Sequence, residues 1–342
     1  MSIVQFPGLG GLELSINRVA FSVFGIPIYW YGIIIAFGFL LAVLLALRDS
    51  KKFGIEPDNI LDLVLFAAPA AIITARLYYV IFTWNLFRDN PIDIFNTRKG
   101  GLAIYGAVIG AFVVAYIYAK KKKMSFFNIM DLCAPFIIMA QGIGRWGNFV
   151  NQEAFGSQTT LPWRMNGTVP NADGVLAGLD LSKWGVHPTF LYESLWCIAV
   201  FFFLIWFRNR KKLVGEVFFL YLILYGFERF FIEQLRTDSL MVGSDVRISE
   251  YLSAVLVIVF TILFVYGRMK LVKAAEDVPV EPGQSEYGSV LAKLREDDGV
   301  PPEEPADRAE DNASEPGDEQ TEEEASDTAE DGKDSGGQKP GA

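Results

Sequence analysis

The chain has 342 residues, of which 51% are hydrophobic and 14% aromatic, and its formal net charge is −10. It has only two cysteines, both in apolar stretches, and a single histidine, so neither a disulfide framework nor a protein-bound metal is expected, and no cofactor is predicted. Acidic residues outnumber basic ones by 22 to 5 in residues 275–342, whereas basic residues outnumber acidic ones by 25 to 18 in the rest. An acidic tail therefore follows a basic, apolar body.

Seven apolar stretches run through the body in chain order. Most of them approach the ~20 apolar residues that are needed to cross the hydrocarbon core of a bilayer. They are Ile26–Leu47, Ile60–Phe82, Leu102–Ala119, Phe126–Ile143, Pro188–Phe207, Val217–Ile232 and Tyr251–Tyr266. The first is expected to remain as an anchor, because no basic segment precedes it and no small-residue cleavage site follows it. The sequence thus predicts an all-α polytopic membrane protein with about seven transmembrane helices within residues 1–274.

The connections between these stretches are alternately rich and poor in lysine and arginine. Basic residues gather after the first, third, fifth and seventh stretches, and such connections face the cytoplasm. The N-terminus is then outside and the C-terminus inside. The long connection over about 145–187 is expected to form a small extracytoplasmic cap. The tail, 275–342, is rich in Glu, Asp, Gly, Ser and Pro, so we expect it to be disordered in the cytoplasm.

The stretch GRWGNFVNQEAFG, residues 144–156, places four polar side chains directly after an apolar stretch. They are Arg145, Asn148, Asn151 and Glu153. A guanidinium, two carboxamides and a carboxylate at the edge of hydrocarbon are costly and usually functional. We therefore interpret this stretch as the centre of a functional site.

A second group of polar residues lies in YGFERFFIEQLRTD, residues 225–238. Tyr225, Arg229, Glu233 and Arg236 are spaced by four, four and three residues, which places them on one face of a helix. Each charge costs ~2.5–3.5 kcal/mol at the centre of a bilayer, so this face must contact protein or water. Glu228 lies one residue off the face and is a weaker candidate.

Other polar or aromatic residues have plainer interpretations. Tyr29 and Trp30 fit an interfacial aromatic belt, and for Arg76 function and anchoring at the headgroups are equally expected. Tyr105 either packs between helices or points into a cavity. The single histidine, His187, is more often a polar interfacial residue at such a position than a catalyst.

Two arginines with neighbouring amide, carboxylate and hydroxyl groups suit a phosphate anion, because guanidinium presents a planar fork of donors to phosphate oxygens. Lipid headgroups carry this anion at the edge of the hydrocarbon. The motifs between Pro27 and Met269 resemble those of phosphatidylglycerol:prolipoprotein diacylglyceryl transferases, and they follow one another in the same order as in that family. The similar blocks are IYWYG, ARLYYV, GGLAIYGAVIG, GRWGNFVNQEAFG, HPTFLYE and YGFERFFIEQLRTD.

The resemblance implies transfer of a diacylglyceryl group from phosphatidylglycerol to the lipobox cysteine of a prolipoprotein signal sequence, in the bacterial cytoplasmic (inner) membrane. The implied partners are these two substrates and membrane lipid, with no nucleic acid. The implied catalytic residues are Arg145, Arg229, Tyr225 and Glu233, and Tyr105 is added as a candidate catalytic residue at a position where the family often has histidine. The implied lipid-binding residues are Tyr31, Arg145, Asn148, Glu153 and Arg229, with Gly156 also in the motif.

In this interpretation Arg145 and Arg229 hold the phosphate and stabilise it as a leaving group, and Glu153 and Glu233 orient the arginines. Many family members have histidine where this chain has Tyr105, so no histidine base carries over. Tyrosine, with an ordinary pKa of ~10, is a poor proton acceptor at neutral pH, and Tyr105 is interpreted as a positioning residue.

Two other classes of function remain open from the residues alone. Intramembrane arginines also line the pathways of anion transporters and channels, although no convincing internal repeat of the kind found in transporters is present. A structural assembly protein is the third possibility, but it would not need tyrosine, arginine and glutamate aligned toward a cavity.

Overall fold

The structure, a computed structural model, describes residues 2–96, 100–237, 241–242 and 246–276. The chain divides into two compact units, residues 1–278 and 279–342, and the second lies outside the described residues. The predicted acidic tail therefore also lies outside them, except for its first two residues, which end the last helix. All of the described helices and strands belong to the first unit.

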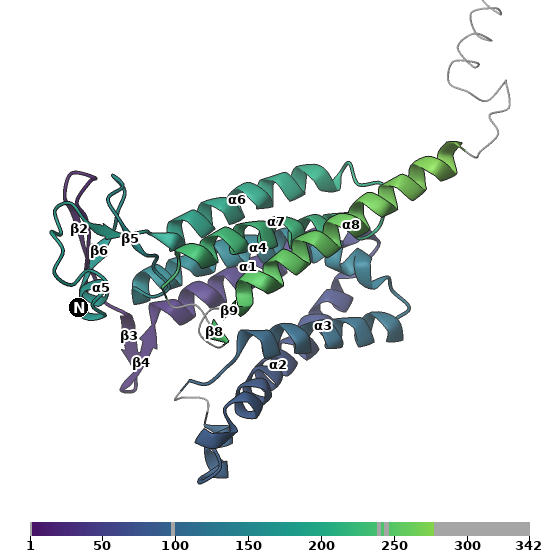
Figure 1. Ribbon diagram of the computed structural model, residues 1–342. Coiled ribbons are helices and arrows are strands. Elements are labelled where there is room, and N and C mark those ends of the chain that lie inside the picture. The colour runs from purple at the N-terminus through teal and green to yellow at the C-terminus, as the bar shows by residue number, and fades with distance from the viewer. Residues whose placement is uncertain (1, 97–99, 238–240, 243–245, 277–342) are drawn as a thin grey trace, which may run out of the picture. The chain divides into compact units, whose positions relative to one another are not determined.

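Seven long helices make up most of this unit (Figure 1). They are α1 (Trp30–Ser50), α2 (Pro57–Phe82), α3 (Ile104–Lys121), α4 (Phe126–Asn151), α6 (Thr189–Arg208), α7 (Glu216–Leu235) and α8 (Ile248–Glu276). Among the described residues, every one of these helices except α7 is long and apolar enough to cross a membrane. The prediction of a mostly helical, multi-pass membrane protein with about seven long helices is confirmed. Helix α7 differs because it carries Glu216, Glu228, Arg229 and Glu233. Arg236, which was predicted on the same helical face as Arg229 and Glu233, instead follows the last residue of α7 with an extended backbone.

Short strands and turns lie mainly at one end of the long helices, which we call the strand-bearing end (Figure 1). Strand β1 (Ser2–Phe6) pairs antiparallel with β2 (Leu12–Ile16) and, on its other side, with β6 (Asn166–Gly167). Strand β3 (Val19–Val23) pairs with β4 (Ile26–Tyr29), β5 (Gln158–Thr159) with β7 (Gly185–Val186), and β8 (Met241–Val242) with β9 (Val246–Arg247). The remaining elements are η1 (Lys51–Phe53), η2 (Trp84–Leu86), η3 (Pro91–Phe95) and α5 (Thr168–Ala172).

Several predicted boundaries differ from the structure, and two of them bear on the site. The first apolar stretch was expected to begin at Ile26, but residues 26–29 form strand β4 and the helix begins at Trp30. The connection after the fourth stretch was expected to start at Arg145, but α4 continues through Asn151. Both errors have the same cause: hydropathy reports transfer into hydrocarbon and does not report which residues are helical.

Helix α4 lies at the centre and packs against α1, α6 and α7, while α2 pairs with α3 and α7 with α8. Small residues allow the close approach at α4. A side chain at Gly142 would meet Cys197 of α6, one at Gly144 would meet Ile35 of α1, and one at Gly147 would meet the ring of Tyr31 of α1. The glycines of the GIGRWG segment are therefore packing residues that bring two helices onto α4.

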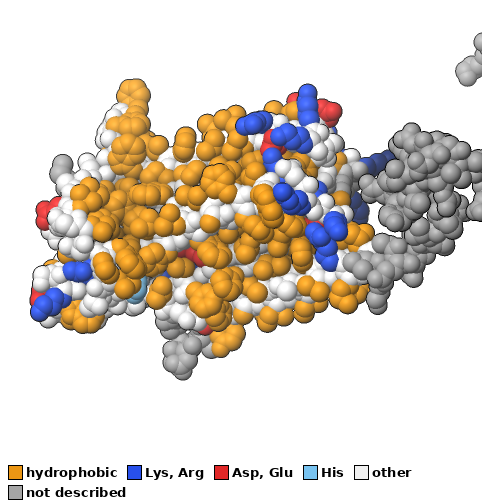
Figure 2. Space-filling view, turned by 90° about the horizontal axis from the view of Figure 1, so that it is seen from above, with side chains coloured by type: hydrophobic (Ala, Val, Ile, Leu, Met, Phe, Trp, Pro, Cys, Tyr) orange, Lys and Arg blue, Asp and Glu red, His pale blue; other side chains and the backbone are white. Residues whose placement is uncertain are grey.

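The opposite end of the helices is basic. In the view of Figure 2, hydrophobic side chains cover much of the long face that is seen, and lysines and arginines gather at the end away from the strands. Here Asp131 of α4, fully buried, accepts hydrogen bonds from the backbone amides of Gly215 (2.8 Å) and Phe218 (2.9 Å) at the start of α7, and from Lys211 (3.0 Å). This carboxylate thus occupies the N-terminus of α7, where free amides and the helix dipole favour an anion.

Candidate functional site

Two arginines from different helices approach the same buried carboxylate. Arg145 of α4 forms an ion pair with Oε2 of Glu193 on α6, and Nη1 of Arg229 on α7 lies 3.7 Å from the same oxygen. Arg229 also pairs with Glu233, four residues further along α7. The arginine side chains are 18% and 15% exposed and the two carboxylate side chains are 1% exposed. The three helices therefore hold a guanidinium pair in one partly enclosed place.

The local sequence explains why these side chains meet. Gly144 and Gly147 flank Arg145 and allow α1 to pack closely on α4. One residue along from Arg145, Trp146 donates a hydrogen bond from Nε1 to Ser194 Oγ of α6 (3.2 Å), next to Glu193. Contacts on α1 and α6 thus fix the rotation of α4, and the Arg145 guanidinium is directed between α6 and α7.

A cavity of about 540 Å³ opens beside Arg145, and we call it the helix cavity. Its lining is mostly apolar and comes from α1, α2 and α4, with a few polar groups that include Arg145, Asn148 and Tyr225. Several of the apolar side chains that line it, such as Ile35, Phe39 and Ile137, are also exposed on the outside of the helices. An apolar cavity with a few convergent polar groups is the usual form of a small-molecule site, and this one suits a lipid.

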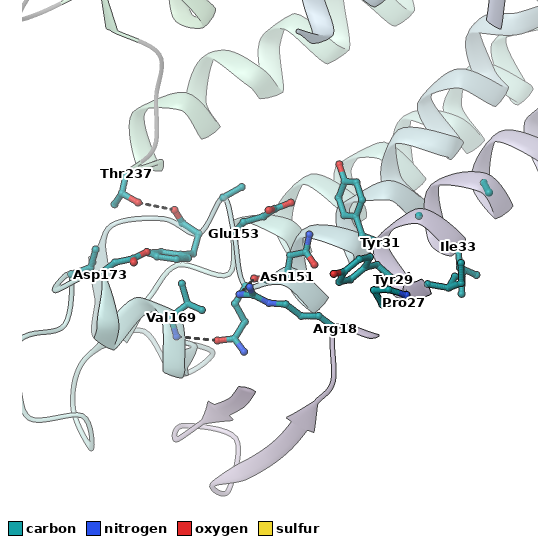
Figure 3. A pocket seen from close by; sticks show the side chains of 17 residues that line it. Arg18, Pro27, Tyr29, Tyr31, Ile33, Asn151, Glu153, Val169, Asp173 and Thr237 are labelled. Atoms are coloured by element: carbon teal, nitrogen blue, oxygen red, sulfur yellow. Dashed lines mark hydrogen bonds between the residues drawn. The ribbon is translucent and has the colours of Figure 1, made fainter. Parts of the chain in front are cut away.

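A second cavity of about 1140 Å³ lies at the strand-bearing end, and we call it the strand-end cavity (Figure 3). Arg18, Asn151, Glu153 and Asp173 line it, together with residues of the β3–β4 hairpin. Tyr31 lines both cavities.

The boundary between the two cavities is polar. Asn148 lines the helix cavity and donates a hydrogen bond from Nδ2 to Oε1 of Glu153 (2.9 Å), which lines the strand-end cavity. Tyr31 completes this boundary by lining both sides. A molecule with an apolar part in the helix cavity would therefore place a polar head beside Asn148, Glu153 and Tyr31.

The structure thus brings most of the predicted site residues into two adjoining groups. Arg145, Arg229 and Glu233 form the ion-paired group, with Tyr225 lining the helix cavity on the same helix as Arg229. Tyr31, Asn148 and Glu153 form the boundary group. The ion-pair partner of Arg145 is Glu193, whereas Glu153 was expected to orient an arginine and instead bonds Asn148.

Tyr105 occupies a different place. Its hydroxyl lies 3.1 Å from Ser249 Oγ, so it joins α3 to the first turn of α8, and its ring lies against Tyr78 of α2. Neither contact involves the arginine pair. The positioning role expected for Tyr105 would therefore act through the placement of α3 beside α8.

Other candidates are structural by their contacts. The guanidinium of Arg76 donates to the backbone carbonyls of Asp93, Ile94, Asn96, Gly100 and Gly101, so it organises the connection between α2 and α3. Nδ1 of His187 lies 3.2 Å from the Tyr192 hydroxyl, and partial burial lowers the pKa of this imidazole. Gly156 is a close-contact position, because an added Cβ would lie 2.7 Å from the Cβ of His187.

Sequence reasoning missed Glu193. The residue lies in HPTFLYES, within the first turns of an otherwise apolar helix, and a carboxylate at such a position is costly unless it is paired. That cost could have marked Glu193 as a candidate. Its arginine partners could not be predicted from sequence spacing, because α4, α6 and α7 are far apart in the chain. Glu228, the weaker candidate, is 6% exposed, and neither of its carboxylate oxygens has a hydrogen-bond partner among the described residues.

Comparisons with known proteins agree with these motifs. A family model described as prolipoprotein diacylglyceryl transferase matches residues 18–266. The chain is similar to three proteins named phosphatidylglycerol–prolipoprotein diacylglyceryl transferase. That of Bacillus cytotoxicus is 47% identical over 256 residues, 75% of this chain and 93% of that protein. That of Finegoldia magna is 44% identical over 261 residues, which are 76% of this chain and 99% of that protein. That of Limosilactobacillus reuteri is 45% identical over 262 residues, which are 76% of this chain and 94% of that protein.

Proposed function

The chain belongs to the prolipoprotein diacylglyceryl transferase family, and from this premise we propose that its arginine pair holds the phosphate of the donor lipid during transfer. The enzyme transfers the diacylglyceryl group of phosphatidylglycerol to the lipobox cysteine thiol of prolipoproteins, forming a thioether and releasing glycerol phosphate, the first step of lipoprotein maturation. The observation that carries the proposal is the meeting of Arg145 and Arg229 at one oxygen of Glu193.

The chemistry asks for a stabilised leaving group. The thiol sulfur attacks the glycerol carbon that bears the phosphate ester, the carbon–oxygen bond breaks, and its electron pair stays on the phosphate oxygen. The proton lost by the thiol is balanced by the proton that the released phosphate monoester gains. Guanidinium groups placed in advance at this oxygen stabilise the developing charge, and such electrostatic stabilisation is usually the largest contribution to catalysis.

Glu193 and Glu233 are positioning residues in this proposal. Each pairs with one or both guanidinium groups, and neither carboxylate lines the helix cavity, whereas Arg145 does, so Arg145 would direct its remaining donors at an anion in that cavity. Two guanidiniums held by two carboxylates form a group without net charge, which lowers the cost of keeping the arginines among apolar helices. A bound phosphodiester then adds charge-assisted hydrogen bonds at ~1.5–3 kcal/mol each.

The cavities suggest how both substrates are held. The acyl chains of phosphatidylglycerol would occupy the helix cavity, whose apolar lining runs along α1 and α2. The headgroup would lie at the boundary, where Asn148, Glu153 and Tyr31 present amide, carboxylate and hydroxyl groups. The strand-end cavity would then receive the lipobox segment and release glycerol phosphate.

Activation of the thiol does not require a histidine in this arrangement. A free cysteine has a pKa of ~8.5, and nearby guanidinium groups lower it, so a weak acceptor is sufficient. Tyr105 hydrogen bonds to Ser249 and supports the position of α3. We therefore assign Tyr105 a positioning role and leave the attack to a thiolate stabilised by the arginines.

We propose that the protein lies in the bacterial cytoplasmic membrane, with the strand-bearing end outside and the basic end inside. Lysine and arginine side chains gather at the end of the helices away from the strands (Figure 2), and this excess of basic residues supports the orientation. The segment 152–187 together with the N-terminal strands would form the extracytoplasmic cap. The acidic tail would be a separate cytoplasmic region that is not needed for transfer.

The decisive experiment is to incubate purified protein with phosphatidylglycerol and a lipobox peptide and to follow the peptide by mass spectrometry. The expected result is a mass increase of one diacylglyceryl group together with release of glycerol phosphate. A peptide in which serine replaces the cysteine is the control and should stay unmodified. An unmodified cysteine peptide in the presence of folded enzyme would overturn the proposal.

A further inference from the structure

The β3–β4 hairpin carries an apolar tip that is left uncovered within the described part of the chain. Phe24 is 100% exposed, and its neighbours Phe21, Val23 and Ile26 are also exposed. The whole segment from Val19 to Trp30 has no charged side chain. Because the hairpin lies outside the spanning helices, its apolar surface is not explained by their burial in hydrocarbon.

The residue at the tip is an unusual choice for its backbone conformation. Phe24 and Gly25 have φ of 49° and 79°, the left-handed conformation at both central positions of a two-residue hairpin turn. Asparagine, aspartate and glycine are preferred there, and a bulky residue is strained. Phe24 therefore combines a strained backbone conformation with an apolar side chain that is fully exposed. The exposed side chain indicates that another surface covers this tip.

The place of the hairpin identifies that surface. Strand β4 ends at Tyr29 and α1 begins at Trp30, so the hairpin continues directly from a membrane span (Figure 1). Tyr29 and Trp30 are exposed aromatic residues at the end of this span, as in an interfacial belt. Five residues of extended chain at ~3.4 Å each keep the tip within roughly 17 Å of the belt.

We propose that the tip of the β3–β4 hairpin, Phe21–Ile26, inserts into the lipid interface at the strand-bearing end of the helices. The proposal rests on the spanning helices and not on the transferase chemistry. The base of the hairpin is fixed to the protein, because Trp30 donates its backbone amide to Arg18 O (3.1 Å) and Arg18 donates to Asn151 O at the end of α4 (2.6 Å). The hairpin therefore relates the depth of α4, and of Arg145 on it, to the lipid surface.

The test uses full-length protein in lipid nanodiscs, with a polarity-sensitive dye on Phe24→Cys and, separately, on Ile26→Cys. Leu9→Cys is the matched control, since Leu9 is likewise an exposed apolar residue in a hairpin turn, that between β1 and β2, but lies far from α1 in the chain. Unmutated protein gives the background from Cys133 and Cys197. The dye is quenched either by nitroxides carried on the lipids or by iodide in the water.

The expected result is quenching by lipid nitroxides and protection from iodide at positions 24 and 26, and the reverse at position 9. Iodide quenching at positions 24 and 26 equal to that at position 9 would overturn the proposal, because the tip would then lie in water. Protection from both quenchers would also overturn it, because the tip would then be covered by protein, either a second copy or a bound peptide. Agreement of the two hairpin positions guards against an effect of one substitution on folding.

Discussion

Replacing Arg229 with lysine tests the phosphate-holding role while keeping the charge that the buried carboxylates need. In the structure this guanidinium pairs with Glu233 and lies 3.7 Å from Glu193, so alanine would leave buried carboxylates without their cation, at about 3–5 kcal/mol. Such a loss would confuse folding with catalysis. Lysine preserves the charge but has no planar fork, so it cannot hold a carboxylate and a phosphate oxygen in the same geometry.

The expected loss follows from one charge-assisted hydrogen bond. Such a bond contributes ~1.5–3 kcal/mol, and each 1.36 kcal/mol corresponds to a tenfold change in rate, so kcat/KM for Arg229→Lys should fall about 10- to 160-fold. The assay is the initial rate of lipobox peptide modification at matched amounts of folded protein, measured by mass spectrometry over a series of phosphatidylglycerol fractions.

Arg268→Lys provides the control. Arg268 also grips a carboxylate with two nitrogens, that of Glu216, but at the basic end of the helices. Its replacement should leave the transfer rate unchanged. Parent-like turnover in Arg229→Lys would refute the reasoning, and equal losses in both variants would show that the effect comes from general destabilisation.

Three further outcomes are expected. Tyr105→Phe should keep the transfer rate within about tenfold of the parent, because this variant loses one neutral hydrogen bond worth ~0.5–1.5 kcal/mol, and Tyr105→His should be tolerated. Initial transfer rates measured against pH check both variants. Complete loss of transfer in Tyr105→Phe would show that the hydroxyl is a true acid or base. Asp131→Ala should lower the free energy of unfolding by at least about 2 kcal/mol. Two backbone amides at the start of α7 would lose their buried acceptor, at ~1–3 kcal/mol for each amide. Thermal unfolding in detergent measures the change, and an unchanged midpoint temperature would contradict the prediction. Burial lowers the pKa of His187, so the unfolded chain binds a proton at this imidazole more readily than the folded chain does. The stability that the neutral imidazole contributes is present above pH ~6.5 and should be lost as pH falls through the folded-state pKa. His187→Gln should remove this part of the pH dependence of unfolding, and an identical dependence in the variant would show that His187 does not cause it.

The part of the site that depends on one helix could be predicted from sequence. Arg229 and Glu233 are four residues apart, and the structure pairs them on α7 as helical spacing requires. The polar end of α4 was predicted to be functional, but its helical state was not predicted. The helix continues there because its polar side chains find partners on α6, Glu193 for Arg145 and Ser194 for Trp146. Those partners depend on tertiary packing that local sequence does not express.

The strands at the N-terminus were missed for a related reason. Strand β1 is completed on one side by β6, whose residues Asn166 and Gly167 come more than 150 positions later in the chain. Short strands that pair over such distances have no periodic signal of their own. Strand β4 was hidden differently, since its apolar residues run directly into α1 and read as the start of the long apolar stretch that was predicted from Ile26.

The apolar side chains shared by the helix cavity and the outer surface of α1 have a consequence for how the enzyme meets its donor. Ile35 and Phe39 line the cavity and also face the surroundings of the helices. A lipid can therefore arrive by diffusion within the plane of the membrane, without passing through water. The rate should then follow surface dilution: adding buffer to a vesicle suspension leaves turnover per enzyme unchanged, whereas mixing a second lipid into the same vesicles lowers it. Competitors of the donor would likewise act according to how much of them partitions into the bilayer.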